Sequence, residues 1–167
     1  SSVELQHLIS DWICRKHDDA RESDDGTTLK KVLMYVTRTQ NGKPELLVFE
    51  HRDQPAAGLQ VPAGTIEAGE AAVTAAWREL YEESGLSDVT LIDRIDVEEW
   101  RNPATGRWHR RHFYQFRARD DVADRWEHVV TSDAEDNGLV FCFRWMAIDL
   151  AEQQLAADHG SALRRLL

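Results

Sequence analysis

Apolar and polar residues follow one another along the chain with two different periods, one typical of helices and one typical of strands. The helical spacing appears first near the N-terminus, where five apolar residues share one face: Leu5, Leu8, Ile9, Trp12 and Ile13. This pattern predicts an amphipathic helix over residues 3–17. The same spacing returns after Glu70, on an inward face made of Val73, Ala76, Trp77 and Leu80. Gly85 supplies a stop signal, so a second helix is expected over residues 70–84.

Short apolar runs separated by turn residues predict a β-hairpin between these two helices. VLMYV at 32–36 and LLVF at 46–49 favour strands, and QNGKP lies between them. An Asn-Gly pair favours the tight turn that joins two antiparallel strands. The stretch before the hairpin, residues 18–28, is acidic and carries a glycine, so it is expected to be a solvated loop.

Three further strands are expected after the second helix. Residues 89–97 alternate as a half-buried strand does, and 112–118 return as their partner after the turn sequence NPATG at 102–106. The run LVFCFRWMAI at 139–148 is apolar on both faces, which is typical of a central strand. The polar stretch 120–137 predicts a long loop.

This order of elements predicts a single α/β domain over residues 1–167. Two short helical patterns complete the chain, AEQQLAA at 151–157 and ALRRLL at 162–167. Helices and strands interleaved in this way favour a mixed sheet with helices packed on its faces. With 42% hydrophobic residues among 167, the chain is large enough to bury one core without disulfides or structural metals.

Charge narrows the possible partners. The chain has 20 Lys and Arg against 30 Asp and Glu, a formal charge of -10, which disfavours nucleic-acid polymers and anionic membranes as partners. No apolar run approaches the roughly 18 residues of a membrane span, and no basic segment opens the chain, so a soluble, cytoplasmic protein is expected. Cys14 and Cys142 lie inside apolar patterns and are interpreted as buried hydrophobic residues of a reducing compartment, with a disulfide between them left open.

Three glutamates crowd the last turns of the second predicted helix. Glu79, Glu82 and Glu83 lie within one turn, at the negative end of the helix dipole, with Arg78 as one neighbouring positive charge. A solvated acidic helix end is the simple interpretation. A hard divalent cation is the alternative, because Mg²⁺ prefers oxygen ligands. The preceding loop, PAGTIEAG at 62–69, would bring bare backbone to the same point, so loop and helix together predict a cradle for a metal and a phosphate.

The stretch from Gly64 to Leu86 carries a longer signature than a pair of acids. Its sequence, GTIEAGEAAVTAAWRELYEESGL, fits G-x5-E-x7-R-E-U-x-E-E-x-G-U at every specified position, with U aliphatic. This resembles the Nudix hydrolase family. The resemblance implies an α/β/α sandwich that uses Mg²⁺ or Mn²⁺ to hydrolyse the diphosphate of a nucleoside diphosphate linked to a further group.

The resemblance also implies roles for residues of this signature. Glu79, Glu82 and Glu83 would bind the metal together with the carbonyl of Ala63, and Glu79 would also be the candidate for activating water. Arg78 would hold a glutamate in place and lie beside the substrate. Two options stay open for Glu70, a cap of the helix or an outer metal ligand.

A further acid from a late loop serves as base or ligand in many members of the family. In this chain the region before WMAI reads FCFR, which departs from that expectation. The candidates are Asp133, Glu135 and Asp136 in TSDAEDNG, and Glu135 is the preferred catalytic residue. A solvated turn is the alternative interpretation of this cluster.

Two segments bear on the substrate. EHRDQPAAGLQVPAGTIEAGE resembles the branch of the family that acts on ADP-ribose and nucleotide sugars, with Arg52 as the arginine that contacts phosphate. Some members of that branch carry a proline beyond the signature; Pro103 lies near that place, but an ordinary turn is the preferred interpretation.

EEWRNPATGRWHRRHFYQF gathers basic and aromatic residues in an otherwise acidic chain. Arg111 and Trp100 are predicted to bind a phosphorylated aromatic ligand through charge-assisted contacts and stacking. Exposed arginines that pair with acids elsewhere, and a metal site of His109 and His112, are the alternatives.

The sequence therefore predicts a Mg²⁺-dependent pyrophosphohydrolase with a small-molecule nucleotide substrate. ADP-ribose or a nucleotide sugar is the first candidate. A nucleoside triphosphate or dinucleoside polyphosphate is the second. A domain of another class, which senses a nucleotide without hydrolysing it, is the third. The resemblance also allows a homodimer, since many Nudix proteins pair.

Overall fold

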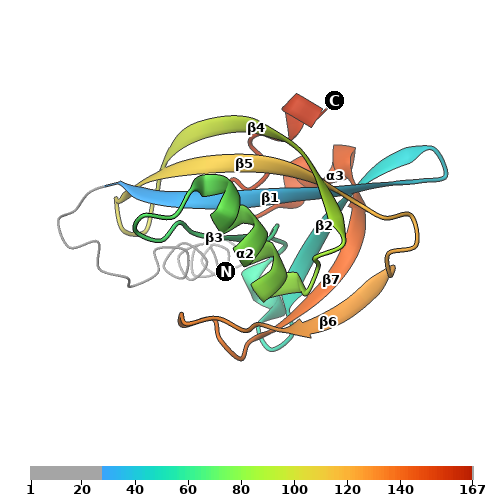
Figure 1. The fold of residues 1–167 in the computed structure, drawn as a ribbon, viewed down its shortest axis with the longest axis horizontal. Coiled ribbons are helices and arrows are strands. Elements are labelled where there is room, and N and C mark those ends of the chain that lie inside the picture. The colour runs from blue at the N-terminus through green and yellow to red at the C-terminus, as the bar shows by residue number, and fades with distance from the viewer. Residues whose placement is uncertain (1–27, 167) are drawn as a thin grey trace, which may run out of the picture.

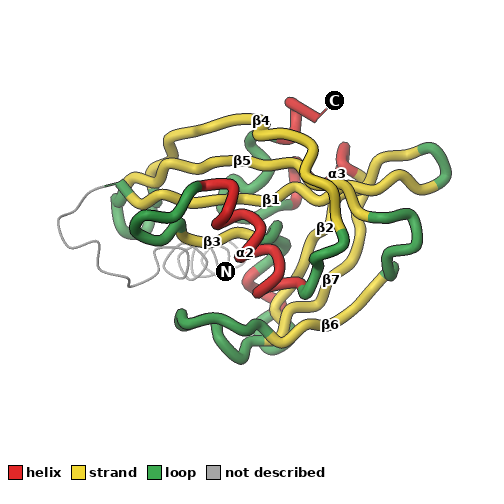
Figure 2. The backbone as a smooth tube through the Cα atoms, viewed as in Figure 1, coloured by secondary structure: helices red, strands yellow, loops and turns green. Residues whose placement is uncertain are grey.

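The computed structural model describes residues 28–166, which form one mixed sheet with helices packed against it (Figures 1 and 2). The predicted helix 3–17, the acidic stretch up to residue 27 and Cys14 lie outside the described residues. The strands are β1 Leu29–Gln40, β2 Lys43–His51, β3 Ala63–Thr65, β4 Val89–Arg101, β5 Trp108–Ala118, β6 Arg125–Val129 and β7 Val140–Ala147. The helices are η1 Pro55–Ala57, α2 Ala72–Ser84, α3 Ile148–Gln154 and η2 Leu163–Leu166, with η marking 3₁₀ turns.

Strand β1 divides one of its edges between two partners. The sheet runs β4-β5-β1-β2-β7-β6, with β1 and β5 parallel and every other pair antiparallel. The end of β1, from Thr37 to Gln40, pairs with β2, whereas its start, Lys31 to Leu33, pairs with β3. Strands β1 and β2 therefore separate along their length, and β3 with its flanking loops enters the gap.

The predicted hairpin is confirmed as β1 and β2. Asn41 and Gly42 join the two strands with φ values of 53° and 75°. Two successive positive φ angles suit the right-handed twist of a hairpin, which explains the Asn-Gly pair at this position.

Alternation along the central strands builds a core on each face of the sheet. On β1, Val32, Met34 and Val36 face the helix α2, which crosses one face of the sheet in Figure 1. Leu33 and Tyr35 face the other side, where α3 and η2 cover them. Both faces are buried because odd and even positions of a strand point in opposite directions. The expected α/β/α sandwich is confirmed.

Helix α2 ends where the sequence predicts and begins two residues later than expected. Gly85 takes φ 78° and ψ 0°, and its amide donates to the Tyr81 carbonyl at 2.9 Å. This left-handed residue closes the helix without the cost that a side chain would add. The first helical residue is Ala72 instead of Glu70: Ala71 is extended, with ψ 146°, and the Glu70 amide closes a turn with the Glu67 carbonyl at 3.0 Å.

The interpretation of residues 120–137 as one long loop is wrong in part. Within this stretch β6 pairs with β7 at the edge of the sheet. Trp126 and His128 are half-buried between exposed neighbours, so only alternate side chains face the protein and the overall polarity concealed a strand. The indole of Trp126 donates to the Ser84 carbonyl at 2.9 Å, which ties β6 to the end of α2.

Cys142 is half-exposed, so its interpretation as a buried hydrophobic residue is wrong. Near β6 the sheet face that carries Cys142 and Arg144 borders an open groove, where Glu127 lies 3.7 Å from the Cys142 sulfur. Burial raises the pKa of this thiol.

The remaining elements differ from expectation mainly at their ends. The strand expected at 89–97 extends to Arg101 as β4, and its partner begins at Trp108. The helix expected at 151–157 covers Ile148–Gln154 instead, as α3, so the expectation of helix at 155–157 is wrong, and the last helical pattern is the short turn η2. Across residues 28–166 no helix is both long and apolar enough to cross a membrane.

Candidate active site

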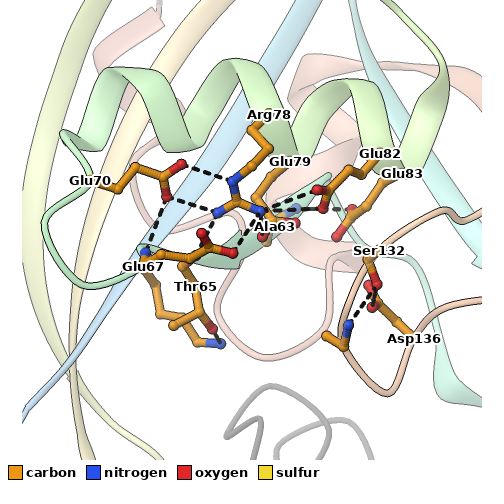
Figure 3. A network of polar contacts seen from close by, with 12 residues as sticks. Ala63, Thr65, Glu67, Glu70, Arg78, Glu79, Glu82, Glu83, Ser132 and Asp136 are labelled. Carbon is orange, nitrogen blue, oxygen red and sulfur yellow. Dashed lines mark hydrogen bonds and ion pairs between the residues drawn. The ribbon is translucent and has the colours of Figure 1, made fainter. Parts of the chain in front are cut away.

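Arg78 organises the acidic cluster at the end of α2 (Figure 3). Its Nε and Nη2 donate to the two carboxylate oxygens of Glu70 at 2.8 and 2.9 Å, a paired contact that matches the planar guanidinium. Nη2 also donates to the Thr65 carbonyl at 3.0 Å, and Nη1 donates to Glu79 at 2.9 Å. One side chain thus joins the helix, the loop before it and strand β3. Glu70 is the partner of Arg78, and no side chain caps α2.

The three glutamates predicted as metal ligands differ in burial. Glu79 and Glu83 are only 7% and 5% exposed, whereas Glu82 is half-buried and lies 3.3 Å from Arg78 Nη1. Glu83 accepts the Ala63 amide at 3.2 Å, so the helix also holds the start of β3. In Figure 3 the side chains of Arg78, Glu79 and Glu82 lie together beside α2, whereas Ser132 and Asp136 lie apart on another loop.

The negative charge of this cluster is incompletely neutralised. Burial raises the pKa of Glu79 to about 7, against the opposing effect of Arg78 and with a further increase from Glu82. Burial likewise raises the pKa of Glu82. The pKa of Arg78 is raised, first by its hydrogen bonds to Glu70. One guanidinium therefore does not balance the buried carboxylates.

Gly64 allows β3 to pack directly on Glu79. A Cβ added to Gly64 would lie 2.0 Å from the carboxyl carbon of Glu79, far inside van der Waals contact. Only glycine permits this approach of backbone and carboxylate. The glycine that opens the signature is therefore required by contact with the acid at its centre.

These residues fit a hard divalent cation in donor type and charge. Carboxylate oxygens with excess negative charge are the ligands that Mg²⁺ and Mn²⁺ prefer. Among residues 28–166, no three acidic, histidine or cysteine side chains are already arranged as a closed metal site, and Glu79 and Glu82 contact Arg78. Cation binding would therefore compete with Arg78 for these two carboxylates.

Metal affinity is expected to depend on pH through Glu79. If Glu79 is a metal ligand, a proton and the cation compete for its carboxylate, whose pKa burial raises to about 7. Affinity should be full above that pH and fall about tenfold per pH unit below it, because one proton must be released. Titration calorimetry with Mn²⁺ between pH 5.5 and 8.5 measures this slope. Glu79→Gln should bind more weakly with a flatter dependence, and an equally steep slope in that variant would contradict the assignment.

The loop 132–136 borders the same cleft as Glu79 and Glu83. The amide of Thr131 donates to the Glu82 carbonyl at 3.2 Å, which anchors the loop to α2. Asp136 accepts the Ser132 hydroxyl at 2.6 Å and is half-buried, whereas Glu135 and Asp133 are exposed. The charge of Asp136 contributes to the raised pKa of Glu79. The structure thus brings Glu135 and Asp136 to the rim of the acidic cluster.

Sequence reasoning missed the cleft residues contributed by β1 and β2. Lys31 is 5% exposed, lines the cleft and donates to the Thr65 hydroxyl at 2.8 Å. His51 lines it as well and packs edge-on against Phe141, with ring centroids 4.6 Å apart. The available signal for Lys31 was a charged residue at a position of an apolar strand that points to the same face as Leu33. Nothing in the local pattern singles out His51.

The predicted substrate ligands outside the signature lie in two other places. Arg52 is 50% exposed, beside Asp53 and 3.9 Å from a Glu127 oxygen. Arg111 is buried, and its guanidinium carbon lies 3.7 Å from the centre of the Trp100 ring. Neither Arg52 nor the Trp100–Arg111 pair lines the cleft that holds Glu79. Their roles in substrate binding stay predictions.

The structure around Trp100 decides between the alternatives for the histidines of β5 and for Pro103. His109 and His112 are three apart on β5 and therefore face opposite sides of the sheet, so they do not form a metal site together. Pro103 lies in the turn between β4 and β5, where the Gly106 amide donates to the Asn102 carbonyl at 2.7 Å. The turn interpretation of this segment is confirmed.

Comparison with known proteins extends these observations. A family model described as the NUDIX domain matches residues 28–166. An RNA pyrophosphohydrolase of Roseobacter denitrificans is 38% identical over 60 residues, which span 36% of this chain and 38% of that protein's length.

Solved structures share the fold at lower identity. A C. elegans Ap4A hydrolase in a binary complex has a TM-score of 0.63 at 20% identity, over 83% of this chain and 95% of that chain. The NUDIX domain of Shewanella oneidensis NrtR, in complex with ADP ribose, has a TM-score of 0.61 at 14% identity, over 84% and 86%. The E. coli dihydroneopterin triphosphate pyrophosphohydrolase has a TM-score of 0.57 at 17% identity, over 83% and 96%.

Proposed function

Because the chain belongs to the Nudix hydrolase family, we propose that it is a Mg²⁺-dependent pyrophosphohydrolase that cleaves the diphosphate linkage of a nucleoside diphosphate derivative. The observation that carries this proposal is the contact of Gly64 with the buried carboxylate of Glu79. Glu83 lies beside it, and Arg78 donates a hydrogen bond to Glu79. Nudix hydrolases generally use a divalent metal. Mg²⁺ is the proposed ion here, with Mn²⁺ as its substitute, and Glu79, Glu82, Glu83 and the Ala63 carbonyl are the proposed ligands.

The chain's own residues support hydrolysis. When bound, the cation would neutralise diphosphate charge and lower the pKa of a water molecule. Glu79 has a pKa near neutrality and is suited to accept a proton from the attacking water. Arg78 holds Glu79 at 2.9 Å and keeps it oriented, while the Ala63 amide holds Glu83. This intact acidic set supports turnover over a sensor that binds without hydrolysis.

ADP-ribose or a nucleotide sugar is the proposed substrate. The support is the likeness of the segment around Arg52 to that branch of the family, together with the fold shared with an ADP-ribose-bound NUDIX domain. A dinucleoside polyphosphate or nucleoside triphosphate is the second candidate, supported by the fold shared with an Ap4A hydrolase. Arg52 is the proposed phosphate ligand; cytoplasmic location and a homodimer stay predictions.

A nucleotide panel tests the function. Purified protein with Mg²⁺ is given ADP-ribose, a nucleotide sugar, a dinucleoside tetraphosphate and a nucleoside triphosphate, and the products are separated by anion-exchange chromatography. Release of AMP and ribose 5-phosphate from ADP-ribose is the expected result. Preferred cleavage of the tetraphosphate or triphosphate would move the assignment to the second candidate. Binding of a nucleotide with no cleavage at any metal concentration would replace the enzyme by a sensor.

The identity of the loop acid gives a separate prediction. If Glu135 acts as base, Glu135→Gln should lower kcat about a hundredfold, since positioned acid–base groups contribute this much or more. Asp133→Asn, an exposed neighbour in the same loop, is the matched control and should leave kcat within twofold. Steady-state kinetics at saturating Mg²⁺ distinguishes them. A large loss of kcat in Asp136→Asn instead would assign the role of base to Asp136, the half-buried acid whose charge raises the pKa of Glu79.

A further inference from the structure

The C-terminal residues 155–162, here called the C-terminal strap, pass beneath the segment that leads into the metal-binding loop. The Ala156 amide donates to the Leu59 carbonyl at 2.9 Å, and Leu155 and Leu59 form a parallel bridge. Two residues further along, the Val61 amide donates to Nδ1 of His159 at 3.3 Å. The strap therefore holds the backbone just before Ala63, the first residue of β3.

Backbone amides in this segment point alternately to different partners. Gln60 exchanges both of its backbone hydrogen bonds with Phe49 of β2, so that amide is held by the sheet. Val61 is fully buried, and its amide turns the other way, to the ring of His159. Pro62 has no amide, and the next one, of Ala63, donates to Glu83. His159 and Glu83 are thus the side chains that take the amides on either side of Pro62.

The strap is itself held in a strained conformation by side chains of three strands. Ala157 and Asp158 have φ values of 52° and 56°, in the left-handed region that residues with a side chain seldom adopt. Arg111 donates to the Ala157 carbonyl at 2.8 Å, and the Trp100 indole donates to Asp158 at 2.8 Å. The Tyr35 hydroxyl donates to the His159 carbonyl. Strain kept in place by several contacts is typical of segments under functional constraint.

These contacts end next to the acidic cluster. His159 is 1% exposed and lines a small pocket together with Ala63, Gly64 and Arg111. Gly64 is the residue whose backbone lies against Glu79. If the strap moved, Val61 and Pro62 would therefore move with it, and so would the loop that the proposed metal-binding acids contact.

We propose that His159 is a positioning residue for the metal-binding loop: through its Nδ1 it fixes the Val61 amide and so sets the placement of Ala63 and Gly64 against Glu83 and Glu79. Arg111 and Trp100 act one step further away, by holding the strap that carries His159. The proposal rests on the proposed function only where catalysis is the readout, because loop placement and metal binding are measurable without a substrate.

Two substitutions at His159 separate positioning from packing. His159→Leu keeps an apolar volume but offers no acceptor to Val61, whereas His159→Asn returns an oxygen acceptor close to the place of Nδ1. Arg164→Gln, whose 81% exposed side chain pairs with Glu152, is the control on the same part of the chain. Hydrogen exchange of the peptide covering residues 60–66, Mn²⁺ affinity by electron paramagnetic resonance, and kcat with KM are measured for all three.

His159→Leu is expected to speed hydrogen exchange in residues 60–66, to weaken Mn²⁺ binding and to lower kcat, each by about tenfold, which is the loss seen for residues that orient metal ligands. KM should stay within twofold of the wild type. His159→Asn should recover most of each loss, and Arg164→Gln should match the wild type. If His159→Leu does not fold, Trp100→Phe removes the bond to Asp158, keeps an aromatic ring beside Arg111 and should give a smaller change in the same direction. A rise in KM alone in Trp100→Phe would instead indicate direct substrate contact and overturn the positioning role.

Equal behaviour of the Leu and Asn variants, whether both unchanged or both impaired, would overturn the role of His159. Failure of the proposed function looks different. In that case the wild type cleaves no nucleotide, while exchange of residues 60–66 still separates the two variants.

Discussion

Replacing Glu83 by glutamine is expected to lower kcat by about a hundredfold to a thousandfold, the loss that follows when part of the charge stabilisation around a metal-bound diphosphate is removed. Glutamine keeps an oxygen that accepts the Ala63 amide, so the hydrogen bond between α2 and β3 survives. The substitution therefore removes the negative charge of Glu83 and leaves the packing of α2 on β3 unchanged. Steady-state kinetics with the preferred nucleotide of the panel measures the effect, and thermal unfolding confirms that the variant is folded.

Glu152→Gln on α3 is the matched control for this substitution. Its carboxylate pairs with Arg164 on the surface, away from the acidic cluster. Its removal should leave kcat within twofold and change stability by less than about 1 kcal/mol, because exposed ion pairs contribute little. If Glu83→Gln retained the activity of this control, Glu83 would have no part in catalysis or metal binding.

Gly64→Ala is expected to be the second severe substitution. The added methyl group would lie 2.0 Å from the Glu79 carboxyl carbon, so either β3 or the Glu79 side chain must move. A misplacement of about 1 Å at a reacting centre costs about a hundredfold in rate, and overpacking costs about 1–3 kcal/mol of stability. Activity should therefore fall much further than the unfolding free energy alone would explain. Kinetics and chemical denaturation on the same preparation measure both quantities.

Gly42→Ala separates backbone strain from this contact. Gly42 has φ 75° in the hairpin turn, and a Cβ there would meet no atom within 4 Å. Its substitution should cost about 1–2 kcal/mol from the left-handed conformation and leave kcat of the folded protein unchanged. If Gly64→Ala lowered stability to the same extent with full activity, the close approach to Glu79 would not matter for catalysis.

Local signals in the sequence were sufficient for the elements that surround the acidic cluster. The end of α2 follows from glycine chemistry at Gly85, and the hairpin follows from Asn41 and Gly42, because each turn conformation requires these residues. The convergence of Glu79 and Glu83 on the preceding loop follows from helical spacing. These predictions depend on neighbours in sequence, so periodicity and turn residues are enough for them.

Contacts between distant segments could not be predicted in this way. Strand β6 was hidden because its partner β7 lies some fifteen residues away and only alternate side chains are buried. Glu70 was assigned to a cap or a metal, whereas eight residues later Arg78 takes both of its oxygens. Trp100 and Arg111 carried a clear chemical signal, yet their partners could not be identified: the pattern assigned Ala157 to a helix and left Asp158 unassigned. Pairing across the sheet is decided by the global fold.

The division of one edge of β1 between β2 and β3 has a consequence for how this scaffold tolerates change. The paired residues Phe49 and Gln60 close the segment between them at its base, so a longer or shorter loop around the exposed residues 52–56 leaves β3 in place against the acids of α2. Loop length carries a low entropic cost in such a closed segment. Insertions between Arg52 and Ala56 are therefore expected to leave the contact between Gly64 and Glu79 in place.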